Sequence, residues 1–189
     1  MQNQKTCSAH LTAETNPTLK EYKTLDLKKA DEIKDMKPEL GDKHKIIFTI
    51  TQKQINNFAE ISGDDNPIHV DPEYIKEKLE NNPRYPFKGN ISHGLLASGK
   101  FSAFYGKLLP GLDTLYTGLN ISFLAPIYPD KEYVAIFEAK EIPGNHRMVY
   151  ENKIVDPELF GTSPDKPNLG ICIAGTSEVY HREKIGKLQ

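Results

Sequence analysis

One short stretch of the chain combines a carboxylate and an imidazole on a segment that must bend. Asp64 and His69 flank an Asn66-Pro67 pair, which favours a turn because proline restricts the residue before it. The two side chains can therefore converge on one point. The aspartate accepts hydrogen bonds, while a histidine ring can donate from one nitrogen and accept at the other. Together they could hold and polarise one water molecule for acid–base chemistry.

Other interpretations of these residue types concern local structure or metal binding. Aspartates form turns and cap helices, so we interpret Asp65 as a turn residue and Asp71 as a helix cap. A metal site is disfavoured, because the spacing of these acidic groups and His69 around the proline matches neither an EF-hand nor a helical zinc pair. Cys7 and Cys172 are too far apart in the chain to suggest a disulfide scaffold or a metal cluster.

A second segment, Gly94 to Lys100, fits most of the phosphate-binding loop pattern. That pattern requires Ser or Thr after the lysine to bind Mg²⁺, and Phe101 stands there instead. Packing of a buried helix explains these small residues better, so nucleotide binding is disfavoured. His93, just before this segment, could support the start of a helix or contact a substrate, and both interpretations stay open.

The elements that position the Asp–His stretch can be predicted from hydrophobic patterns and capping signals. Alternating residues predict a strand near 46–50. A capping box of Thr51 and Gln54 begins a helix that ends at Gly63. Asp71 followed by proline begins another helix, which fades near 79. The Asp–His stretch therefore connects two helices.

The rest of the chain predicts one long helix followed by strands. Residues 93–109 are apolar on most helical faces, so this helix is expected to be buried nearly all round. Consecutive strands joined by turns then favour an antiparallel sheet, and they are expected at 115–124, 133–142, 147–155 and 169–180. The fold class predicted is α+β, with a curved antiparallel sheet wrapped around a long central α-helix.

Length and composition suit one domain with an extension. Of the 189 residues, 1–42 form a polar N-terminal extension, expected to be mobile or to lie across the surface, with a possible helix at 25–36. Residues 43–189 form the domain. A net charge of −2 argues against a nucleic-acid partner. No apolar run approaches the ~20 residues of a membrane span, and the polar start argues against a secretory signal, so a cytoplasmic location is expected.

Three motifs resemble those of the MaoC-like dehydratases, a family that includes the (R)-specific enoyl-CoA hydratases. Phe58 to His69 resembles the hydratase signature of the family. Ile91 to Ser98 resembles the His-Gly opening of its central helix, and Asn120 to Pro126 resembles the strand that follows. The motifs occur in the family's order, and the similarity extends from about residue 40 to the C-terminus.

The resemblance implies a hot-dog fold and a hydro-lyase. Family members add water to trans-2-enoyl thioesters to give (R)-3-hydroxyacyl thioesters, or catalyse the reverse dehydration. It implies Asp64 and His69 as the catalytic pair and Gly94 as donor of a backbone N–H to the thioester carbonyl, in keeping with the closeness that glycine permits. Ser102 falls where family members often have a serine near the site.

Further expectations concern substrate, partners and cofactors. Asn66 and His93 complete the candidate substrate-binding residues, and the substrate would be a thioester of CoA or acyl carrier protein. No metal or organic cofactor is expected. A homodimer is expected, because one hot-dog unit leaves a sheet edge to cover.

Departures from the family leave alternatives open. The segment between Asp71 and His93 is longer than in compact relatives, the 156–168 loop is another possible insertion, and Ile75 replaces a small residue. These differences concern pocket shape and acyl-chain length. The alternatives are a non-catalytic module that binds acyl thioesters, a subunit of a heterodimeric dehydratase, or a thioesterase. The presence of both Asp64 and His69 favours the hydratase.

Overall fold

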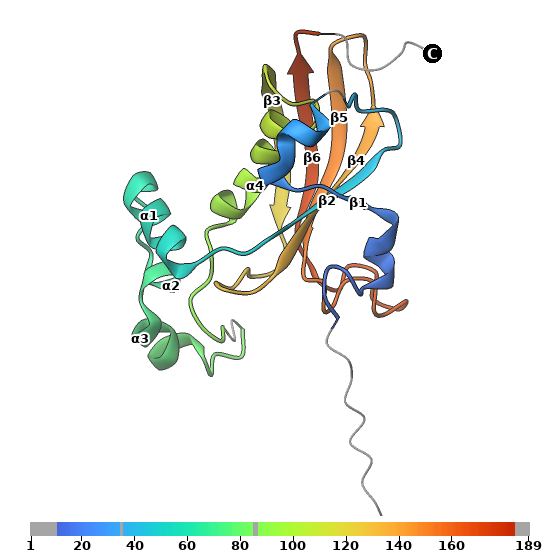
Figure 1. Ribbon diagram of the computed structural model, residues 1–189. Coiled ribbons are helices and arrows are strands. Elements are labelled where there is room, and N and C mark those ends of the chain that lie inside the picture. The colour runs from blue at the N-terminus through green and yellow to red at the C-terminus, as the bar shows by residue number, and fades with distance from the viewer. Residues whose placement is uncertain (1–10, 35, 85–86, 184–189) are drawn as a thin grey trace, which may run out of the picture.

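A six-stranded sheet forms the frame of the molecule. The computed structural model describes residues 11–34, 36–84 and 87–183 (Figure 1). The strand order is β1-β2-β4-β5-β6-β3, and only the β1–β2 pair is parallel. The strands are β1 (Lys23–Thr24), β2 (Lys43–Phe48), β3 (Thr114–Phe123), β4 (Tyr133–Glu141), β5 (Arg147–Val155) and β6 (Ile171–His181). The prediction of an antiparallel sheet after the long helix is confirmed.

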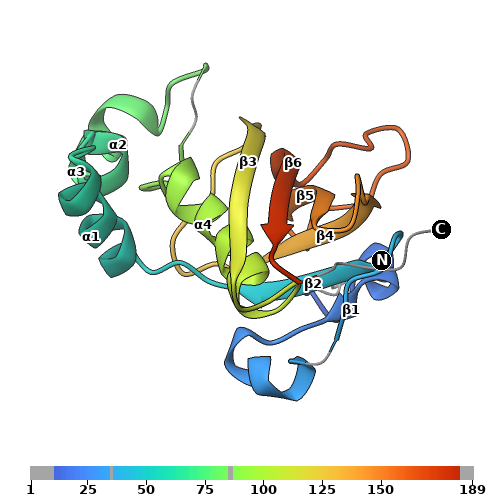
Figure 2. The same ribbon diagram turned by 90° about the horizontal axis from the view of Figure 1, so that it is seen from above.

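The central helix α4 (Gly94–Lys107) lies in the concave side of the curved sheet (Figure 2). Its buried face includes Phe101 and Phe104. The Phe104 ring stacks on Phe137 of β4 with centroids 3.7 Å apart. Burying each such side chain contributes roughly 1.5–3 kcal/mol, so this contact is a main attachment of the helix to the sheet.

The expectation that this helix is buried nearly all round is wrong for the single chain. Leu95 is 62% exposed, and Gly99 and Ser102 on the same face are also exposed. The sheet curves around only one side of α4. The apolar character of the opposite face therefore has no counterpart within the described residues of the chain.

The predicted helices around the Asp–His stretch are confirmed. Helix α1 (Gln52–Ser62) begins with the capping box of Thr51 and Gln54, and Gly63 ends it in the left-handed conformation, with φ 76°. The Asp71 carboxylate accepts hydrogen bonds from the first turn of α3 (Pro72–Tyr74), and a π-helical turn, η3 (Ile75–Leu79), completes that helix. A further short helix, α2 (Pro67–Val70), was not expected.

The described part of the N-terminal extension contacts both faces of the sheet: residues 13–22 pack on the outer face, and residues 25–33 pack against the main core on the side of α4. It contains two 3-10 helices, η1 (Pro17–Glu21) and η2 (Leu27–Ile33), the second within the expected helix at 25–36. Ala13, Leu19 and Tyr22 pack against β4 in a second apolar cluster. The Nζ atom of Lys45 in β2 donates to the carbonyl oxygens of Ala13 and Leu19, at 3.2 and 2.7 Å. The domain boundary at residue 42 stays a prediction.

Two other sequence expectations concern cysteines and membranes. Cys172 is buried, and burial raises the pKa of its thiol to about 12, whereas Cys7 lies outside the described residues. Within 11–34, 36–84 and 87–183, no helix has the length and apolarity needed to cross a bilayer.

Replacing Leu19 tests whether the extension is part of the folded unit. Because its side chain is fully buried, Leu19→Ala should lower the free energy of unfolding by about 2–5 kcal/mol. Lys20 is the exposed neighbour and serves as the control. Lys20→Ala should change the free energy of unfolding by less than about 0.5 kcal/mol. Urea denaturation measures both values. Equal stabilities for the two variants would show that the extension does not pack on the sheet in solution.

Candidate active site

The bend between α1 and α2 brings Asp64 and His69 together. Gly63 turns the chain out of α1, and the Asn66 side chain caps α2 by accepting from the amide of Ile68. His69 lies in the last turn of α2 and is 7% exposed, while the Asp64 side chain is 56% exposed. Asp64 Oδ2 and His69 Nε2 are 3.9 Å apart. The convergence expected from the spacing is therefore present.

The hydrogen bonds of His69 define which ring nitrogen is available for chemistry. Nδ1 lies 2.8 Å from the carbonyl oxygen of Ile91, which can only accept, so Nδ1 carries the hydrogen in the neutral ring. Burial lowers the pKa of His69, and His93 lowers it further, whereas the Ile91 bond and Asp64 act in the opposite direction. Nε2 is therefore an acceptor that faces the Asp64 carboxylate.

The separation of these two acceptors suits a shared water molecule. A distance of 3.9 Å is too long for a direct hydrogen bond. One water at about 2.8 Å from each atom could donate a hydrogen to both acceptors. The pair can therefore orient a water oxygen and receive a proton from it.

His93 packs directly behind the pair. Its ring stacks on His69 with centroids 3.8 Å apart and an interplanar angle of 27°, and its Nε2 donates to the carbonyl oxygen of Asp64 at 2.8 Å. It makes no capping hydrogen bond to α4, so any support that it gives to the helix start is by another route.

Asp64, His69 and His93 are also the cluster most suggestive of a metal ion, with candidate ligand atoms within 4.8 Å of one another. A metal bonds to imidazole along the nitrogen lone pair, in the plane of the ring. Two stacked rings direct their lone pairs along separate, nearly parallel planes, and His93 Nε2 is already bonded to Asp64. A shared ion would require these rings to repack.

A pocket of about 620 Å³ adjoins His69 and the start of α4. Gly94 is the first residue of α4, where backbone N–H groups have no partner within the helix. A Cβ atom at Gly94 would overlap the Phe123 ring, so glycine is needed for this close packing. The lining is mostly apolar and consists of His69, Arg84, Phe87, Ile91, Ser92, Gly94, Phe123, Leu124, Ala125, Pro126, Ile127, Tyr128 and Ile173.

The structure separates the remaining candidates from this pocket. Of the predicted site residues, His69 and Gly94 line the pocket, and Ser102 lies on the exposed face of α4. The predicted site residues that are not among the described lining residues are Asp64, Asn66, His93 and Ser102. Arg84 and Phe87, which sequence reasoning did not single out, come from the segment expected to be longer than in compact relatives. The unusual length of that segment was the one feature of the sequence that could have pointed to these two residues. The catalytic and binding roles of all these residues stay predictions.

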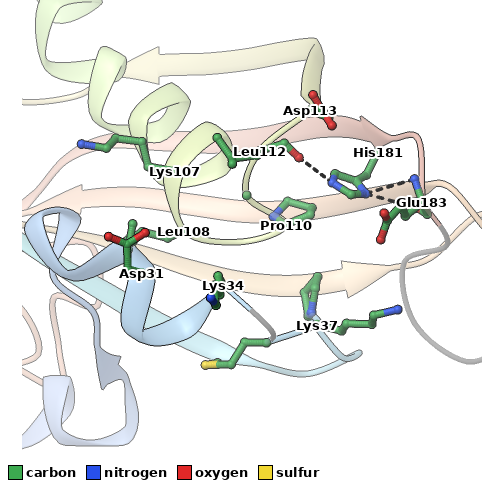
Figure 3. Close-up of a pocket in the computed structure, with 14 residues that line it drawn as sticks. Asp31, Lys34, Lys37, Lys107, Leu108, Pro110, Leu112, Asp113, His181 and Glu183 are labelled. Atoms are coloured by element: carbon green, nitrogen blue, oxygen red, sulfur yellow. Dashed lines mark hydrogen bonds between the residues drawn. The ribbon is translucent and has the colours of Figure 1, made fainter.

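A second depression, of about 400 Å³, lies at the opposite end of α4 (Figure 3). Lys34, Lys37 and Lys107 line it together with Asp31, Asp113 and Glu183, so cationic and anionic groups balance. No residue of the Asp–His stretch lines it. The pocket beside His69 and Gly94 is therefore the candidate active site.

Comparisons with known proteins show which family the chain resembles. The MaoC like domain model matches residues 36–156. The (R)-specific enoyl-CoA hydratase of Aeromonas caviae is 31% identical over 100 residues, covering 53% of this chain and 69% of that protein. The 3-hydroxybutyryl-CoA dehydratase of Methylorubrum extorquens is 35% identical over 125 residues, covering 62% of this chain and 75% of that protein.

A solved structure shows the same fold. The (R)-hydratase of A. caviae superposes with a TM-score of 0.62 at 23% identity, covering 76% of this chain and 97% of that one. The hot-dog fold expected from the sequence is confirmed. With the family model matching well over half of its residues, the chain belongs to the MaoC-like family.

Proposed function

We propose that this protein adds water to the double bond of a trans-2-enoyl thioester to form an (R)-3-hydroxyacyl thioester, or catalyses the reverse dehydration. The observation that carries the proposal is the 3.9 Å separation of Asp64 Oδ2 and His69 Nε2 beside a pocket that Gly94 also lines. Family membership and the names of the relatives support the same chemistry.

The acid–base pair would supply the water and the protons. A water that donates to Asp64 and His69 attacks C3 of the enoyl group and gives up one hydrogen to the pair. The pair then returns a proton to C2, so that one water molecule is added in total. Positioned acid–base groups contribute typically ~10²–10⁴-fold to a rate.

The start of α4 would stabilise the charge that develops during attack. As the C3–O bond forms, electrons move toward the thioester carbonyl oxygen. The backbone N–H of Gly94 can donate to that oxygen, and the positive end of the helix dipole adds to the effect. A donor of this kind is worth ~10²–10³-fold.

A second copy of the chain is the proposed structural partner. Strand β3 is at the edge of the sheet, and Leu115, Leu119 and Phe123 on it are 60%, 45% and 56% exposed. Leu95 on α4 adds to this apolar surface. An unpaired, apolar edge strand favours association. The substrate carrier, CoA or acyl carrier protein, and the cytoplasmic location remain predictions from the sequence.

Substituting the pair tests the proposed reaction. Asp64→Asn and His69→Ala should each lower the turnover of crotonyl-CoA by about 10²–10⁴-fold, measured by loss of the enoyl ultraviolet absorbance. Asp65→Asn is the matched control, because Asp65 is an exposed neighbour without a role in the pair, and it should retain the wild-type rate. Near wild-type turnover by either pair variant would refute the assigned roles. Binding of crotonyl-CoA without turnover by the wild type would instead favour the non-catalytic module.

Gly94→Ala tests the role of the helix start. The added methyl group would collide with Phe123 and displace the donor, so kcat/KM should fall by about 10²-fold or more. Removing the ring in a Gly94→Ala/Phe123→Ala variant should restore part of the loss. Gly89→Ala serves as control, since no atom lies within 4 Å of its Cβ position. Unchanged kcat/KM in Gly94→Ala would exclude this site for the carbonyl oxygen.

Light scattering tests the proposed homodimer. The wild type should be a dimer at micromolar concentration, and Leu119→Asp should shift it toward monomer because it places a charge on the β3 edge. Leu159→Asp is the control, since Leu159 is similarly exposed, at 43%, but lies in the loop between β5 and β6. A wild-type protein that is entirely monomeric would contradict the proposal.

A further inference from the structure

We propose that His93 is a positioning residue that holds Asp64 and His69 in their working geometry and does not itself exchange protons with the substrate. The inference rests on the proposed function, because it assigns a role within that site. It gives different roles to two histidines whose rings are in contact: His69 takes part in acid–base chemistry, and His93 positions it.

The first contact holds the backbone of Asp64. Asp64 follows the left-handed Gly63 and lies outside both neighbouring helices. The other hydrogen bonds that Asp64 makes with described residues are local: its amide donates to Ser62 Oγ at 3.2 Å, and its Oδ1 accepts from the Asn66 amide at 3.4 Å. The 2.8 Å bond from His93 Nε2 comes from a residue 29 positions away. His93 therefore ties the bend to the start of α4.

The second contact fixes the ring of His69. The His93 ring lies against His69 on α2, at 3.8 Å, and against Phe58 on α1, at 4.9 Å between centroids. Stacking on His93 sets the plane of the His69 ring, and the Nδ1 bond to Ile91 sets its rotation within that plane. Nε2 is thereby directed toward Asp64.

Both contacts originate in one anchored segment. Ile91 supplies the acceptor for His69, and His93 supplies the donor for Asp64. Between them, the amide of Ser92 donates to the carbonyl oxygen of Ile127 at 2.7 Å. Movement of this segment would therefore displace the acid and the imidazole together.

The environment of His93 does not suit proton transfer to a substrate. Its Nε2–H already donates to the carbonyl oxygen of Asp64. Among the described residues its Nδ1 is buried without a hydrogen-bond partner. The residue is 3% exposed. A general acid or base must come within hydrogen-bond reach of the reacting group, and His93 is enclosed behind His69.

Two substitutions separate the hydrogen bond from the aromatic packing. His93→Phe keeps a ring but removes the donor, and kcat for crotonyl-CoA should fall about 10–100-fold, since small displacements of catalytic groups reduce rates by such factors. KM should change by less than about threefold, because the pocket lining is retained. His93→Gln keeps an N–H donor at a similar reach and should recover most of the lost kcat.

A substitution at His44 serves as the control for these variants. His44 is another buried histidine, 4% exposed, which contacts Phe104 away from the site. His44→Phe should leave kcat unchanged even if it lowers the melting temperature. Wild-type kcat in His93→Phe would overturn the positioning role. A His93→Gln variant as inactive as His93→Phe would also overturn it, in favour of proton transfer by the imidazole.

Nitrogen-15 NMR of the histidine rings tests the geometry without any substrate. We expect His93 in the tautomer with hydrogen on Nε2 and His69 in the tautomer with hydrogen on Nδ1. The opposite tautomer at His93 would contradict the bond to Asp64. This readout is independent of catalysis, so a wild-type protein that fails to hydrate crotonyl-CoA would refute the proposed function alone.

Discussion

The reversal of the chain between α1 and α2 is the constraint on which the candidate site depends. Gly63, with φ 76°, ends one helix, and Pro67 begins the next. A side chain at a left-handed position costs about 1–2 kcal/mol, so glycine makes the reversal inexpensive. Within this bend Asp64 stays partly in solvent while His69 is buried, although the two are 3.9 Å apart. Burial lowers the pKa of His69 and so favours the uncharged form of its ring.

Helix α4 serves the core and the site with different parts of its length. Its buried face stacks Phe104 on Phe137, which secures the helix to the sheet. Its N-terminus borders the pocket, and no side chain caps it within the part of the chain that the structure describes. A Ser or Asp cap would contribute about 1 kcal/mol but would use an N–H group of the first turn. The residue at the cap position, His93, bonds to Asp64 instead, which leaves those groups to a ligand.

Features set by short segments were predictable from the sequence, and features set by distant contacts were not. The capping box at Thr51, the end at Gly63 and the extents of the later strands depend on neighbouring residues, and they were confirmed. The meeting of Asp64 and His69 was predictable for the same reason. The bond from His93 to Asp64 joins residues 29 apart. The contact of Phe123 with Gly94 likewise depends on how β3 packs beside α4, which no local pattern encodes.

The same reasoning explains why the burial of α4 was overestimated. Hydropathy showed that α4 is apolar on most faces, but not what covers each face. The extension is polar on average, yet Ala13 and Leu19 supply the few apolar contacts that the outer face of β4 requires. With that face covered, a group of exposed apolar side chains remains on β3 and on the free face of α4. Phe123 belongs to that surface and also packs against Gly94. A second copy bound along β3 would therefore contact Phe123, which packs against the start of α4. The same side chain would then affect both the association of two copies and the geometry of the site.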